Sequence, residues 1–118
     1  MRNEVTEAHT ATAVGSGDVP VLATPWLISW MEAATVEAAG PFVSEGQTTV
    51  GTGIRIRHLH ATPVGGQVDC VAEPPAEADG RKLTFRVRAV DGSGQLVATG
   101  EIDRAIVDRE RFLAGATA

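Results

Sequence analysis

The chain has 118 residues, of which 43% are hydrophobic and 21% charged, and its formal net charge is −5 at pH 7. This length suits one core, so we expect residues 1–118 to form a single domain. The negative net charge argues against non-specific electrostatic binding to nucleic acid or to an anionic membrane. Neither is expected as a partner.

The cysteine content and the most apolar segments exclude further classes of protein. Cys70 is the single cysteine, which excludes an intrachain disulfide and any metal site built from several thiolates. The first ten residues, MRNEVTEAHT, are polar and unlike a secretory signal. The most apolar run, VPVLATPWLISWM, is too short and too broken by proline to span a bilayer. A soluble cytoplasmic protein is therefore expected.

The first half of the chain predicts a strand followed by a long helix. Residues 4–14, EVTEAHTATAV, are rich in threonine and valine and are expected to form an opening strand. Thr24 is then expected to cap a helix with Pro25 in its first position, and Gly40 and Pro41 to end it. Between them, apolar residues recur on one helical face: Leu27, Trp30, Met31, Ala34 and Ala38.

Four further strands are expected after the helix. In GTGIRIRHLHATP, residues 51–63, alternation places His58 and His60 on the same face as Ile54 and Ile56. The other three strands lie in QVDCVAEPPAEA, RKLTFRVRAVD and QLVATGEIDRAIVD, separated by the turn signals DG and GSG. The final stretch, RERFLAGA, suits either a short helix or a frayed tail.

This order of elements indicates the fold class. Short connections favour antiparallel neighbours. One long helix covers only one face of a five-stranded sheet, so we expect an α+β fold with the helix laid on the sheet. The other face must meet solvent, a partner or a ligand, and a solvated face is the simplest interpretation. It carries four arginines: Arg55, Arg57, Arg86 and Arg88.

Four segments together resemble the fluoroacetyl-CoA thioesterase-like family. They are TPWLISWMEAATVEAAGPF, GTGIRIRHLHATP, GRKLTFRVRAVDG and DRAIVDRERF, and they keep the family's order and approximate spacing over about residues 23–112. The resemblance implies the hotdog fold, a curved antiparallel five-stranded sheet wrapped around one long central helix. It also implies that a homodimer hydrolyses an acyl-CoA thioester without a metal or a cofactor, coenzyme A being only part of the substrate.

The same resemblance marks four site positions. The family's threonine at the helix start corresponds to Thr24, its glutamate eight residues later to Glu32, and its histidine on the next strand to His58, all three as catalytic residues. Its glycine seven residues before that histidine corresponds to Gly51, as a substrate contact. His60 has no counterpart with a role. The fluoroacetate-selective member has a lid phenylalanine shortly before the threonine, whereas SGDVPVLA has no aromatic residue, so no strong preference for fluoroacetyl-CoA is expected.

Each catalytic assignment has a simpler alternative. Glu32 lies in an apolar stretch, where desolvation would raise its pKa and suit a general base or nucleophile, but it could also face solvent. His58 could position water or protonate a leaving thiolate, or could be a structural histidine with a hydrogen-bond partner. Thr24 could be a plain helix cap. Eight helical residues rise about 12 Å, so Thr24 and Glu32 cannot touch.

Two other functions are compatible with this fold. One is hydration or dehydration of an acyl thioester, and the other is non-catalytic binding or sensing of acyl-CoA. The sequence leaves the acyl group open, and it allows either coenzyme A or a protein-bound carrier. It also allows either direct attack by water or an anhydride on Glu32, and either subunit as the source of each catalytic residue.

Overall fold

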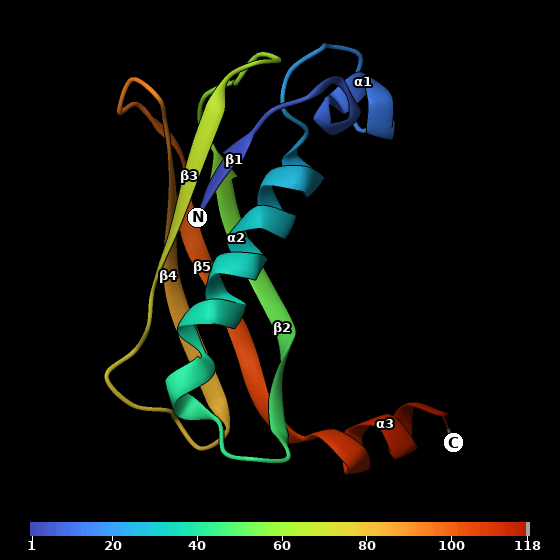
Figure 1. The fold of residues 1–118 in the computed structure, drawn as a ribbon, viewed down its shortest axis with the longest axis vertical. Helices are drawn as coiled ribbons and strands as arrows, with labels where there is room; N and C mark the ends of the chain where they lie inside the picture. Colours follow the sequence, from blue (N-terminus) through green and yellow to red (C-terminus); the bar gives the residue numbers. More distant parts are fainter. Residues whose placement is uncertain (118) are drawn as a thin grey trace.

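The computed structural model describes residues 1–117, which form one five-stranded antiparallel sheet with a long helix across one face (Figure 1). The strands are β1 (Arg2–Glu4), β2 (Gln47–His58), β3 (Gln67–Glu73), β4 (Lys82–Asp91) and β5 (Leu96–Asp108). The helices are α1 (Ala11–Val14), α2 (Thr24–Ala38) and α3 (Arg109–Thr117), with short 3-10 helices η1 (Glu7–His9) and η2 (Gly40–Phe42). The expected α+β class is confirmed. No helix among these residues is long and apolar enough to cross a membrane.

The strand order places β2 at an edge of the sheet. The order is β1-β3-β4-β5-β2, and each neighbouring pair is antiparallel. β2 pairs with β5 from Gln47 opposite Asp108 to His58 opposite Ala98, with a bulge between Gly51 and Gly53. A bulge inserts one unpaired residue and bends its strand. The other long side of β2 is therefore an open edge in this chain.

The expectation of an opening strand in residues 4–14 was wrong. β1 ends at Glu4, and the chain then turns through η1 and α1. The Thr6 backbone N–H donates to His9 Nδ1 at 2.9 Å, and the Ala13 N–H donates to the Thr10 hydroxyl at 3.2 Å. Such local bonds between side chains and backbone compete with a strand ladder, which explains the turns in this threonine-rich stretch.

Helix α2 packs its expected apolar face against the sheet. Leu27 and Met31 have no exposed surface, and Trp30 and Ala34 are also buried. Thr35 was absent from the expected face but is buried too, and its hydroxyl is satisfied by donating to the Glu32 carbonyl within the helix at 2.6 Å. The sheet side of this core includes Val68, Leu83, Phe85, Val97 and Ile102.

The predicted Asp79-Gly80 turn forms, but it does not join two strands directly. Asp79 and Lys82 exchange two backbone hydrogen bonds of 2.9 Å around Gly80, whose φ is 61°. β3 ends earlier, at Glu73, because the two prolines that follow cannot donate to a strand ladder. Residues 74–81 therefore form a longer connection than the turn signal predicted.

The outer face of the sheet carries the arginines. Arg55 pairs with Asp103 at 2.9 Å and with Glu101 at 3.2 Å, and the Thr84 hydroxyl donates to Asp103 at 2.8 Å. The Arg55 guanidinium holds the pKa of Asp103 down at about 2. The interpretation as a solvated face fits the exposure of all four arginines: Arg55, Arg57, Arg86 and Arg88.

Candidate active site

Thr24 and His58 meet where α2 begins. The Thr24 Oγ1 atom lies 2.7 Å from His58 Nδ1. The contact exists because the helix starts one residue earlier than expected: Ala23 is the N-cap, and Pro25 follows Thr24 within the first turn. The expectation that Thr24 caps the helix was therefore wrong, and its hydroxyl bonds the imidazole instead.

His58 is the last residue of β2 and is half-buried, as the alternation indicated. Its Nε2 atom is buried and has no hydrogen-bond partner among residues 1–117. Burial lowers the pKa of His58 below its ordinary value of 6.5, and a backbone hydrogen bond at His60 opposes this shift only in part. The lowered pKa favours a neutral imidazole, which can accept a proton.

Both residues border a cavity of about 330 Å³. One wall is the segment between α1 and α2, and another is the chain that follows β2. Small and aliphatic side chains make up much of these walls, so the cavity suits an apolar group next to the Thr24–His58 pair. Among them are Gly17, Val19, Val21, Leu22 and Ala61.

Glu32 belongs to a second cluster, further along α2. Its Oε2 atom lies 3.8 Å from Arg104 Nη1 on β5, and its side chain is 36% exposed, more open than its apolar sequence neighbours indicated. Gly51 on β2 faces the same carboxylate: a Cβ added there would lie 2.8 Å from Glu32 Oε2. The strand needs a residue without a side chain at this position so that the carboxylate can lie against it.

Arg104 is the residue of this cluster that sequence reasoning missed. Its side chain is 8% exposed, and it donates from Nε to the Thr49 hydroxyl at 2.8 Å and from Nη2 to the Thr49 carbonyl at 3.0 Å. Burial lowers the pKa of Arg104, an effect that Glu32 opposes, and guanidinium groups stay charged in proteins. A signal was present, because alternation in EIDRAIVD puts Arg104 on the face of the buried Ile102.

His60 lies beyond the end of the strand that carries His58, although one continuous strand was expected for both. β2 ends at His58, and the backbone N–H groups of Leu59 and His60 both donate to the Val97 carbonyl, at 2.7 and 3.2 Å. The chain therefore bends before His60, which is exposed. Ile54, also expected on the buried face, is 42% exposed because β2 lies at the sheet edge.

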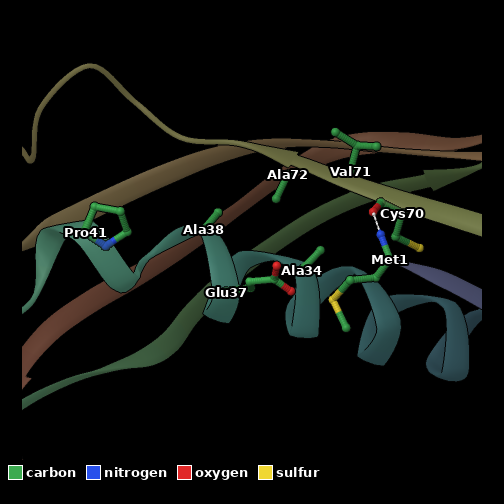
Figure 2. A pocket seen from close by; sticks show the side chains of 8 residues that line it. All are labelled: Met1, Ala34, Glu37, Ala38, Pro41, Cys70, Val71 and Ala72. Atoms are coloured by element: carbon green, nitrogen blue, oxygen red, sulfur yellow. Dashed lines mark hydrogen bonds between the residues drawn. The ribbon is translucent and has the colours of Figure 1, made fainter.

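A second cavity of about 330 Å³ lies between α2 and β3 and is bordered by none of the predicted site residues (Figure 2). Its lining includes Ala34, Ala38 and Ala72, and the Met1 amino group donates to the Cys70 carbonyl at 2.7 Å. Burial raises the pKa of the Cys70 thiol to about 11, so this cysteine is an unreactive core residue.

A metal-binding cluster is not found in the described part of the chain. No group of three or more His, Cys, Asp or Glu side chains in residues 1–117 could hold a metal ion. Thr24, His58, Glu32 and Arg104 instead offer a hydroxyl, an imidazole, a carboxylate and a guanidinium, which are groups that move protons and stabilise charge.

Sequence comparisons identify relatives of the chain. Residues 5–110 match the family described as fluoroacetyl-CoA-specific thioesterase. The fluoroacetyl-CoA thioesterase of Streptantibioticus cattleyicolor is 37% identical over 92 residues. This alignment covers 78% of the present chain and 65% of that protein, so the chain spans just under two thirds of the relative's length.

Structural comparisons agree. A crystal structure of a variant of the fluoroacetyl-CoA-specific thioesterase FlK, in complex with fluoroacetate and CoA, matches with a TM-score of 0.88 and 30% identity, covering 99% of this chain and 94% of that one. A thioesterase superfamily member from Thermus thermophilus also matches with a TM-score of 0.88 and 30% identity, covering 97% and 83%. The expected hotdog fold is thereby confirmed. The chain belongs to the fluoroacetyl-CoA-specific thioesterase family.

Proposed function

We propose that this protein hydrolyses an acyl-CoA thioester to a free acid and coenzyme A, with Thr24, Glu32 and His58 as the catalytic residues. The observation that carries the proposal is the 2.7 Å contact of Thr24 Oγ1 with His58 Nδ1 at a cavity wall, with the buried Nε2 of His58 left unpartnered among residues 1–117. The named activity of the relatives supports the reaction class. The proposed chemistry uses no metal and no cofactor.

His58 is the proposed proton carrier. When its Nδ1–H donates to Thr24 Oγ1, Nε2 is unprotonated and can accept a proton from the water that attacks the thioester carbonyl. The imidazolium then returns this proton to the sulfur as the C–S bond breaks, so one water is consumed and one thiol released. Free N–H groups in the first turn of α2 can stabilise the carbonyl oxygen as it gains charge, although Pro25 supplies none.

Glu32 lies too far along α2 to reach the same thioester carbon in one subunit. It is eight residues from Thr24, a rise of about 12 Å along the helix. A second copy removes this difficulty if the two open β2 edges pair antiparallel about a point near Ile54. The Gly51 end of one strand then lies opposite the His58 end of the other.

This pairing defines the proposed homodimer. Each active site combines Thr24 and His58 of one subunit with Glu32 and Arg104 of the partner subunit. The carboxylate of Glu32 orients the attacking water, while the Arg104 guanidinium, 3.8 Å away, balances its charge. The dimer also covers Ile54, which is 42% exposed in one chain, and closes an unpaired sheet edge.

The residues of the cavity wall next to Thr24 affect which acyl groups the site prefers. The segment before the helix contributes Gly17, Val19 and Val21 to this wall and contains no aromatic side chain. Aliphatic contacts discriminate weakly between a hydrogen and a fluorine on a two-carbon acyl group. We therefore expect kcat/KM for fluoroacetyl-CoA to exceed that for acetyl-CoA by less than about a hundredfold. A larger ratio in a thiol-release assay would contradict this.

Thr24 provides the sharpest test of the reaction. Thr24→Val keeps the shape of the side chain but removes the hydroxyl, whereas Thr24→Ser keeps the hydroxyl. We expect valine to lower kcat/KM for thiol release by about a hundredfold or more, and serine to retain most activity. Equal activity of the two folded variants would contradict the role of the hydroxyl.

The same assays separate the alternative functions. Loss of the double bond of an enoyl-CoA without thiol release would identify a hydratase. Binding of acyl-CoA by the wild-type protein without any turnover would identify a sensory or binding domain. Either result would overturn the proposed hydrolysis.

A further inference from the structure

His60 lines the same cavity as Thr24 and His58, but the proposed chemistry leaves it without a role. Its Nδ1 atom lies 2.8 Å from the Leu96 carbonyl oxygen. A carbonyl oxygen can only accept a hydrogen bond, so Nδ1 must carry a proton. In the neutral ring, Nε2 is then a hydrogen-bond acceptor with a fixed tautomer.

We infer that His60 Nε2 accepts a hydrogen bond from the substrate's pantetheine arm, namely from the amide N–H nearest the sulfur. This inference rests on the proposed function, because it assumes a coenzyme A-type thioester beside Thr24 and His58. It makes His60 a substrate-binding residue rather than a proton carrier.

The dimensions of the substrate fit this assignment. The Cα atoms of His58 and His60 are two residues apart, which is at most about 7 Å. In an acyl-CoA, sulfur and two methylene groups join the reacting carbonyl carbon to the nearest amide nitrogen, a span of about 5–6 Å when extended. With the thioester carbon at His58, the span to this N–H is therefore comparable to the separation of the two histidines, which line one cavity.

The chemistry of the cavity favours the arm over the acyl group as the partner of His60. A saturated acyl chain has no hydrogen-bond donor, whereas the arm carries amide N–H groups. A neighbouring hollow of about 370 Å³ shares the lining residue Ala61 with this cavity, and Thr62 and Asp91 help to line it. The side of the cavity at His60 therefore has room for the arm to leave towards this hollow.

Two substitutions separate binding from a purely structural role. His60→Asn keeps a donor near the position of Nδ1, and thus the bond to Leu96, but has no atom at the position of Nε2. His60→Gln offers a carbonyl oxygen near the position of Nε2 and loses the bond to Leu96. We expect His60→Asn to raise KM about three- to tenfold with little change in kcat, and His60→Gln to stay closer to wild type.

Truncated substrates complete the test. One is an N-acetylcysteamine thioester, which keeps the amide N–H, and the other is its analogue with an ester oxygen in place of that N–H. Wild type should lose about three- to tenfold in kcat/KM on this exchange, and His60→Asn should lose almost nothing.

The outcomes are distinct. The inference would be overturned if wild type and His60→Asn lost equally in kcat/KM when the ester replaces the amide N–H. It would also be overturned if His60→Asn had the KM of wild type and His60→Gln were impaired. Neither result would affect the proposed hydrolysis. Failure of the wild type to release thiol from any acyl-CoA would overturn the proposed function and this inference together.

Discussion

The contact of Thr24 with His58 depends on where one helix begins. At an N-cap position, a threonine hydroxyl would accept hydrogen bonds from the helix's own N–H groups. Ala23 occupies that position instead, and the Thr24 hydroxyl lies 2.7 Å from His58 Nδ1. A shift of one residue at the helix start therefore converts a structural threonine into a partner for the imidazole.

The pKa of His58 predicts the pH dependence of the reaction. His58 must be neutral to accept a proton, and burial lowers its pKa below the ordinary value of 6.5. The neutral form thus persists to lower pH than in an exposed histidine, so the acid limb of kcat/KM should have its midpoint below pH 6.5. Thiol release measured from about pH 5 to about pH 8 checks this. A midpoint at or above 6.5 would contradict the assignment.

The same shift affects stability in the same direction. A group whose pKa is lowered on folding binds its proton more tightly in the unfolded chain, so protonation favours unfolding. The contribution of His58 to the unfolding free energy should therefore decrease as the pH falls below 6.5. Replacement with glutamine, which does not titrate, should remove this part of the pH dependence in denaturant titrations.

Some residues of the site were predictable and others were not. The positions of Thr24, Glu32 and His58 follow from motifs that each lie within one element, so their spacing can be read along the chain. Arg104 reaches Glu32 only because β5 pairs with β2, with Gly51 opposite Arg104. Local periodicity gives the face of a residue but not its neighbour on another strand, which is why the Glu32–Arg104 pair was missed.

At the level of elements, the bulge in β2 decides which face Gly51 occupies. Strict alternation would place Gly51 with Arg55 and Arg57 on the outer face. The bulge between Gly51 and Gly53 reverses the alternation, and Gly51 instead faces Glu32. Two glycines within one strand can mark a bulge, but they do not say which face the earlier glycine occupies. The strand pattern alone would therefore have placed Gly51 away from Glu32, whereas the resemblance included it among the site positions.

Gly51→Ala tests this geometry. The added Cβ would lie 2.8 Å from Glu32 Oε2, so the carboxylate must move. We expect kcat/KM to fall about tenfold or more, with Tm changed little because the side chain that moves is flexible. Gly92→Ala is the matched control, since its Cβ would have no atom within 4 Å. Full activity of Gly51→Ala would show that the position of Glu32 does not matter for catalysis.

At the level of the whole molecule, the sequence predicted the class and the number of strands but not their order. β3, β4 and β5 are neighbours in the sheet in chain order, whereas β2 pairs with β5, which follows it only after β3 and β4. This non-local pairing places β2 at one edge of the sheet, with β1 at the other, and α3 extends beyond the end of β2 in Figure 1. The case for a dimer comes from this edge and from the separation of the Thr24–His58 pair from the Glu32–Arg104 pair along α2.

The most direct test of the shared active site combines two inactive variants, Glu32→Gln and His58→Ala, in one dimer. The two chains, carrying different tags, are produced together, and the mixed dimer is purified through both tags. If each site takes His58 from one subunit and Glu32 from the partner, one of the two sites in the mixed dimer is intact, and it should release thiol at about half the wild-type rate. If both residues act within one subunit, both sites are damaged, and a folded mixed dimer without activity would contradict the account.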